Sequence, residues 1–159
     1  RPPRSTLFPY TTLFRSLLGP TVSAQFLPGV SEITGFGGVT INGKNKATTG
    51  IAVALNMSPQ MGLEGEVGVI FTKDETLTIS GNAVLNLGYG TSFVVPYLTG
   101  GAGMLNNGGT EIALNLGGGF KLFVEPNLAL RTDFRVFLTT EDGDVEDLER
   151  FYAGVEILF

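Results

Sequence analysis

The chain of 159 residues contains no cysteine, no histidine and no tryptophan. Without cysteine there is no disulfide framework, and without cysteine or histidine the usual ligands of a zinc site are missing. Its apolar stretches are shorter than the roughly 18 residues of a transmembrane helix, so the sequence predicts none. Basic residues are also few, with 10 Lys and Arg against 15 Asp and Glu. An acidic chain without a basic patch argues against a nucleic acid as partner, and no cofactor is indicated.

Glycine, in contrast, is abundant, with 23 residues. The glycines lie inside segments in which apolar residues alternate with polar or small ones. Such alternation is typical of β-strands, because successive side chains point to opposite faces, and no segment has a 3.6-residue stripe. The sequence predicts eight strands, at 31–41, 47–57, 61–71, 77–88, 92–104, 110–123, 128–138 and 149–159.

The connections between these strands alternate between two kinds. Three are tight turns, at 58–60, 89–91 and 124–127, and four are longer polar loops, at 42–46, 72–76, 105–109 and 139–148. An even number of strands with short turns at one end and longer loops at the other is the layout of a transmembrane barrel. We therefore predict an all-β, eight-stranded, antiparallel up-and-down transmembrane β-barrel with both termini at the short-turn end.

Alternation alone does not say whether the apolar face points outward to lipid or inward to a core. A soluble lipocalin-like barrel has the same period with the faces reversed. The polar face here carries few charges among many small residues, its charges are nearly balanced, and tryptophan and cysteine, expected in a lipocalin, are missing. These features favour an apolar exterior and an enclosed ion-pair network. The predicted network consists of Glu64, Glu66, Lys121, Arg131, Asp133, Arg135, Arg150 and Glu156.

The last predicted strand has an apolar face that ends in an aromatic residue. Phe151, Val155, Ile157 and Phe159 lie on this face, and Phe159 is the final residue. This pattern resembles the C-terminal signature of bacterial outer-membrane β-barrels. The resemblance implies that these four residues form the signal read by the barrel assembly machinery, which would then be a partner.

Two glycine-rich segments, 63–68 and 96–103, look like strands of the small eight-stranded outer-membrane barrels typified by the OmpA membrane domain and OmpX. The resemblance covers about 31–159 and implies a monomer in the bacterial outer membrane, in contact with outer-membrane lipid and lipopolysaccharide. A peptidoglycan-binding domain after Phe159 is not expected. The short loops make an elaborate receptor or adhesin role doubtful. Some such barrels modify lipid A with a His, a Ser and an acid, an arrangement that a chain without histidine excludes.

Two acidic features of the sequence are candidate sites. Glu64 and Glu66 lie two residues apart and could form a catalytic carboxylate pair, but membership of the lumen network is the better interpretation. Asp142, Asp144 and Glu146 belong to an acidic stretch that could hold a divalent cation, since such ions prefer several oxygen ligands. Its spacing is not that of an EF-hand, and a solvated acidic loop is the simpler alternative. The sequence predicts no enzyme.

The N-terminus is interpreted as foreign to the barrel. Residues 1–16 resemble, without a mismatch, one reading frame of a widely used sequencing adapter, and such segments are excluded from fold reasoning. Residues 17–24 are interpreted as the tail of a truncated signal peptide, with a short apolar loop as the alternative. The barrel domain is then 25–159, which keeps seven Lys or Arg and 15 Asp or Glu, a net charge of −8.

The sequence therefore predicts a small outer-membrane β-barrel with a lumen filled by side chains and an envelope-structural or surface-interaction role. Eight strands leave an interior that side chains about fill, which argues against a large pore. Two alternatives remain open at this point: a soluble lipocalin-like barrel that binds an apolar ligand, and a narrow porin-like channel.

Overall fold

The computed structural model describes residues 28–73, 75–88, 93–106, 108–141 and 144–159, and for residues 140, 141 and 144–146 it describes the backbone alone. The predicted N-terminal segments 1–16 and 17–24 and the predicted turn 89–91 lie outside these ranges.

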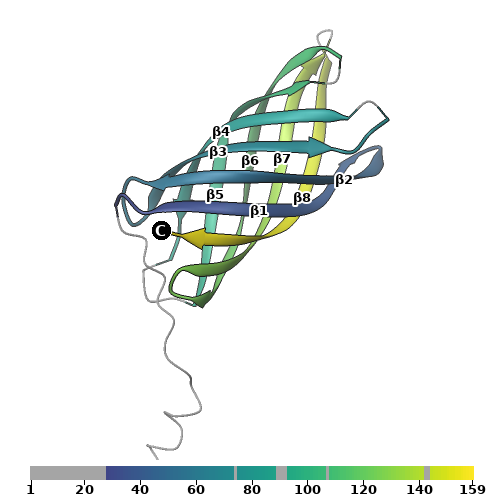
Figure 1. The fold of residues 1–159 in the computed structure, drawn as a ribbon. Helices are drawn as coiled ribbons and strands as arrows, with labels where there is room; N and C mark the ends of the chain where they lie inside the picture. The colour runs from purple at the N-terminus through teal and green to yellow at the C-terminus, as the bar shows by residue number, and fades with distance from the viewer. Residues whose placement is uncertain (1–27, 74, 89–92, 107, 142–143) are drawn as a thin grey trace, which may run out of the picture.

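Eight antiparallel strands form a closed barrel, as predicted (Figure 1). Each strand pairs with the next in sequence, and β8 closes the sheet by pairing with β1. In the described part of the chain, no helix is long and apolar enough to cross a membrane. The strands are β1 (Ser31–Asn42), β2 (Lys44–Asn56), β3 (Met61–Ile70), β4 (Thr76–Asn86), β5 (Val94–Asn106), β6 (Thr110–Glu125), β7 (Leu128–Glu141) and β8 (Asp144–Leu158).

The strand bounds do not bear out the predicted contrast between short turns at one end of the barrel and longer loops at the other. The predicted tight turn 89–91 belongs to the seven residues between Asn86 and Val94. The predicted loop 42–46 is a tight turn at Gly43, whose φ of 62° lies in the left-handed region that glycine adopts easily. The predicted loop 139–148 is largely a hairpin, because β7 continues to Glu141 and β8 already begins at Asp144. Cross-strand pairing satisfies the backbone there, so the strands continue through residues too polar to show an apolar alternation.

The two faces of the sheet differ as the alternation predicts. Apolar side chains on the outer face are exposed, and Leu116, for example, exposes 71% of its surface. The inner face carries threonine, asparagine and charged side chains that are almost completely buried. This arrangement is the reverse of the lipocalin-like alternative, in which the apolar face would line the interior.

Inward-facing apolar side chains lie at both ends of the lumen. At the end of the barrel that holds the C-terminus (Figure 1), here named the short-turn end, one cluster of buried apolar residues packs inside the barrel. A second cluster lies toward the opposite end, named the loop end. The first consists of Val95, Phe123, Ala129 and Leu158, and the second of Ile70, Leu105, Ala113, Phe137 and Leu148. The polar middle of the lumen thus lies between two apolar layers.

Candidate functional site: the lumen charge network

The structure brings all eight residues of the predicted network into the lumen. They come from β3, β6, β7 and β8, where they occupy the inward positions of the alternation. None of them exposes more than 3% of its surface. Burial of this degree is unusual for charged side chains and requires that they are paired.

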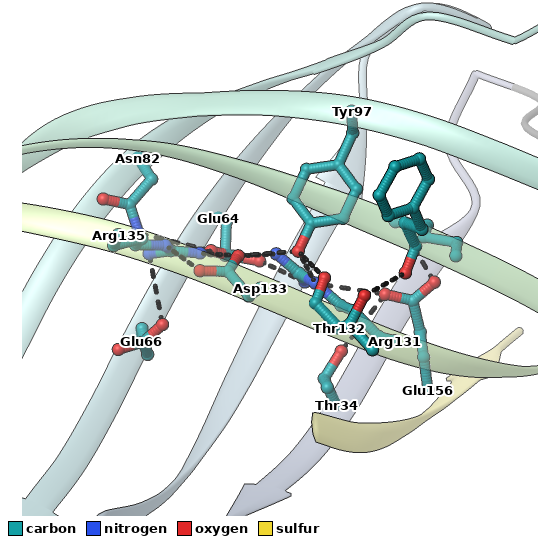
Figure 2. Close-up of polar contacts among 12 residues, drawn as sticks. Thr34, Glu64, Glu66, Asn82, Tyr97, Arg131, Thr132, Asp133, Arg135 and Glu156 are labelled. Carbon is teal, nitrogen blue, oxygen red and sulfur yellow. Dashed lines mark hydrogen bonds and ion pairs between the residues drawn. The ribbon is translucent and has the colours of Figure 1, made fainter. Parts of the chain in front are cut away.

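At the centre of the network, one carboxylate of β3 is bound by two guanidinium groups of β7. Nη1 of Arg131 lies 2.5 Å from Oε2 of Glu64, and Nη2 of Arg135 lies 2.7 Å from Oε1 of the same side chain. Arg135 also donates through Nε to Oδ1 of Asp133, at 2.9 Å. Figure 2 shows these groups converging from two separate strands. The centre of the lumen is therefore cross-braced by charge-assisted hydrogen bonds, the strongest kind.

Toward the short-turn end, one lysine forms ion pairs with two carboxylates. Nζ of Lys121 lies 2.5 Å from Oε2 of Glu32 and 3.1 Å from Oε1 of Glu156. The side-chain amide of Asn56 donates to the other oxygen of Glu32 at 2.7 Å, and the hydroxyl of Thr34 donates to Glu156 at 3.2 Å. Neutral donors thus support the two carboxylates that share a single ammonium group.

Toward the loop end, the last cation of the network, Arg150, lies among aromatic rings. Nη1 of Arg150 lies 2.6 Å from Glu66, which also lies 3.2 Å from Nη1 of Arg135. The guanidinium of Arg150 is 4.9 to 5.3 Å from the ring centres of three aromatic residues, Phe36, Phe137 and Tyr152. Rings at this distance stabilise a cation through their π-electrons.

The contacts join into one continuous chain of ion pairs along the lumen. It comprises five carboxylates and four cations, a formal charge of −1, and every member has an opposite charge within 3.5 Å. In order, the chain runs Glu32, Lys121, Glu156, Arg131, Glu64, Arg135, Glu66 and Arg150. Asp133 lies beside Glu64 as a second carboxylate between Arg131 and Arg135.

Inward-facing glycines make room for these long side chains. Gly117 pairs across strands with Arg135, and a Cβ at Gly117 would lie 2.7 Å from Cγ of that arginine. Gly119 pairs with Asp133 in the same way. A Cβ at Gly119 would lie 2.9 Å from the hydroxyl of Tyr97. Small residues therefore stand opposite large ones, so the side chains pack without widening the barrel.

Glu32, Asn82 and Tyr97 also belong to the polar lumen, and the sequence did not predict them there. The hydroxyl of Tyr97 donates to Asp133 at 2.6 Å and accepts a hydrogen bond from Nε of Arg131 at 2.9 Å. Asn82 donates to Glu64 at 3.2 Å. Alternation along the strand could have indicated that Glu32 points inward, since its neighbour Ile33 is apolar and is exposed on the outer face.

The other predicted site residues either lie on the outer face or are not described by the structure. Asp142 lies outside the described residues and the side chains of Asp144 and Glu146 are not described, so the cation site stays a prediction. Among the described residues, no group of three His, Cys, Asp or Glu side chains could hold a metal ion. Phe151, Val155, Ile157 and Phe159 are exposed on the outer face, and their role in assembly stays a prediction.

The fold is shared with small eight-stranded outer-membrane β-barrels of known structure. The N-terminal β-barrel domain of Pseudomonas aeruginosa OprF is 16% identical, with a TM-score of 0.70 over 82% of this chain and 98% of that one. Neisserial surface protein A, NspA, is also 16% identical, with a TM-score of 0.61 over 82% of this chain and 96% of its own. Ail, the attachment invasion locus protein of Yersinia pestis, is 16% identical, with a TM-score of 0.58 over 84% of this chain and 100% of its own.

No protein-family model and no curated protein matches the sequence. At identities this low, the structural comparisons establish the fold and leave function to the residues of this chain.

Proposed function

We propose that the protein is a monomeric barrel of the bacterial outer membrane, with a closed lumen that neither conducts nor catalyses. Its role is then structural in the envelope, or lies in contacts at the cell surface. The observation that carries this proposal is the lumen itself, in which nine charged side chains form a continuous network between two apolar layers.

The side chains that fill the lumen support the proposal that the protein does not conduct ions. Ions cross a pore through water or through sites that replace their hydration shell. Here the charged groups are bound to one another and expose at most 3% of their surfaces. The apolar layers contain Phe123 at one end and Phe137 at the other, both buried. A narrow channel would require that the side chains of these layers and of the network separate and leave a water-filled path.

The outer face supports a position in a lipid bilayer. Leucine, isoleucine, valine and phenylalanine side chains cover it, and more than half of the surface of Ile51, Leu114 and Phe151 is exposed. An apolar exterior of this extent is typical of proteins that span membranes with strands. Outer-membrane lipid and lipopolysaccharide are then its surroundings, and the barrel assembly machinery is the partner expected during insertion.

The carboxylates support a structural role over a catalytic one. The pair considered as a catalytic site, Glu64 and Glu66, is bound by arginines and buried. A carboxylate pair that acts on a glycosidic bond needs space between its members for substrate and water. In the described part of the chain, the side chains of Arg135 and Arg150 lie against Glu64 and Glu66, where a substrate and a water molecule would have to bind.

Reconstitution into planar lipid bilayers tests the closed lumen. We expect no stepwise conductance from the folded protein at any applied voltage that leaves the bilayer intact. The variant Phe137→Ala, which thins one apolar layer, should remain silent as well, because the ion-pair network lies beneath it. Regular conductance steps from the wild-type barrel would instead establish the narrow channel.

A further inference from the structure

The β7–β8 hairpin extends beyond the end of β1. β8 pairs with β7 from the Glu141–Asp144 pair onward. Its ladder with β1, in contrast, reaches only as far as the pair of Ile41 with Glu149. Within the described ladders, residues 144–148 therefore have a neighbouring strand on one side alone, at the loop end of the barrel (Figure 1).

The hydrogen bonds at the other end of β8 identify which backbone groups face the open side. The N–H of Phe159 donates to the carbonyl of Ser31 at 3.0 Å, and the N–H of Ser31 donates back at 2.9 Å. The N–H of Leu158, one residue earlier, instead donates to Asn127 on the β7 side at 2.9 Å. In an antiparallel ladder this direction alternates from residue to residue.

The alternation continues to the start of β8, because its registers with both neighbours run without a bulge. Odd-numbered residues of β8 therefore direct their N–H and C=O groups toward β1. Two of them, Val145 and Asp147, do so beyond the point where the β1 ladder ends. Among the described strands, none pairs with β8 at these two residues on this side, so the edge offers two donors and two acceptors to an incoming strand.

We propose that the edge of β8 at residues 144–148 binds an extended, basic segment of another protein, which adds to the barrel wall as a further strand. Backbone hydrogen bonds to Val145 and Asp147 would supply the pairing. Charge selects the partner, because the sequence from 144 to 149 is strongly acidic and the described side chains beside this edge, Asp147 and Glu149, are both carboxylates. Lysine or arginine side chains on the added strand would lie beside them and speed the encounter.

Charge also argues against a second copy of this chain as the occupant. Two β8 edges brought together would place like carboxylates across from one another, which destabilises a strand pair. Charged residues on an edge commonly prevent such self-pairing. An edge that repels itself and still presents free backbone groups is suited to a partner of opposite charge.

This inference goes beyond the proposed function and is tested separately from it, in detergent micelles. The probe is a capped decapeptide of alternating lysine and valine, added to isotopically labelled protein. Backbone NMR should show amide exchange at Val145 and Asp147 slowed by about tenfold or more. The amide of Glu146, which faces β7, should change little. Unchanged exchange at both odd-numbered residues would overturn the proposal.

Two controls separate strand addition from simple charge attraction. The same peptide with every backbone nitrogen methylated keeps its charge, and it should bind about tenfold more weakly because its donors are gone. On the protein, Val145→Pro removes one edge donor and should weaken binding, whereas the matched Val145→Ala should not. Equal affinity for the two peptides would reduce the site to an acidic surface. A dimer that Val145→Pro dissociates would identify self-association instead, and would also overturn the proposal.

Discussion

At the scale of single residues, the lumen depends on partners that cannot be removed one at a time. Each buried ion has lost its water, and only its neighbours replace that hydration. Arg131 illustrates the point, since it lies within 3.5 Å of Glu64, Asp133 and Glu156 and also donates to Tyr97. Through these four partners, Arg131 links strands β3, β5, β7 and β8 inside the barrel.

Truncation of this arginine should destabilise the barrel strongly. Arg131→Ala leaves Glu64 and Glu156 short of a cation in an enclosed site, which should cost about 3 kcal/mol of the free energy of unfolding. Urea unfolding in detergent micelles measures this change. The matched control is Leu130→Ala on the outer face, which removes no charge. Equal unfolding midpoints for Arg131→Ala and the wild type would mean that the network is not closed.

The shared lysine allows a sharper test of coupling. Lys121→Met leaves Glu32 and Glu156 near each other without their common ammonium group. The further substitution Glu32→Gln removes one of these two charges. We therefore expect the double variant to be more stable than Lys121→Met alone, by about 1–2 kcal/mol. Urea unfolding of the four proteins in the cycle gives this value, and strict additivity of the two changes would contradict it.

At the scale of strands, inward glycines determine where the large side chains fit. Gly154 of β8 pairs with Phe36 on one side and Arg131 on the other. A Cβ at Gly154 would lie 2.5 Å from the carbonyl oxygen of Gly35 and 3.0 Å from Cβ of Phe36. Backbone atoms cannot move aside without disturbing the ladder, so the glycine is required for space.

Substitution of this glycine should therefore be costly, whereas an outward glycine should tolerate the same change. Gly154→Ala should destabilise the barrel by about 1–3 kcal/mol, the usual range for overpacking. The matched control is Gly65→Ala on β3, because a Cβ there would meet nothing within 4 Å. Refolding yield and urea midpoint report both variants. If the two substitutions have equal effects, the tight packing around Gly154 is not rigid.

The outer face gives a second prediction at this scale. Leu116, near the middle of β6, and Ile112, near its loop end, both point outward and are largely exposed. An arginine at bilayer depth costs about 2–4 kcal/mol, and the cost falls to about 0–1 kcal/mol near the interface. In lipid vesicles, Leu116→Arg should therefore lower stability much more than Ile112→Arg. Similar losses of stability for both variants would mean that Leu116 does not lie deeper in the bilayer than Ile112.

The sequence was sufficient for the strands wherever apolar and polar residues alternate clearly. It identified all eight strands and the inward parity of the eight network residues, because a one-residue slip would reverse the faces. It did not identify the long β7–β8 hairpin, since residues 139–148 are too polar for the alternation to be visible. It could not identify the individual ion pairs. Arg131 and Glu64 are 67 residues apart in sequence, and the closure of the barrel alone brings them together.

At the scale of the whole molecule, the barrel has its polar groups inside and its apolar groups outside. Burial of the lumen network is compensated by ion pairs. The exposed leucine, valine and phenylalanine side chains of the outer face have no such compensation in water, and they occur on all eight strands. A hydrocarbon environment removes this surface from water, so the stability of the fold should depend on lipid or detergent.

Expression from Gln25, without the N-terminal segment, tests this dependence directly. The protein should be insoluble or aggregated without detergent and should fold in micelles or lipid vesicles, because only an apolar surrounding covers the outer face. A folded barrel resists dodecyl sulfate until it is heated, so unheated and boiled samples should migrate differently on a gel. The matched control is Gly154→Ala, which should shift to the boiled position at a lower temperature than the wild type. A soluble, folded monomer in plain buffer would refute the membrane assignment, whatever the state of the lumen.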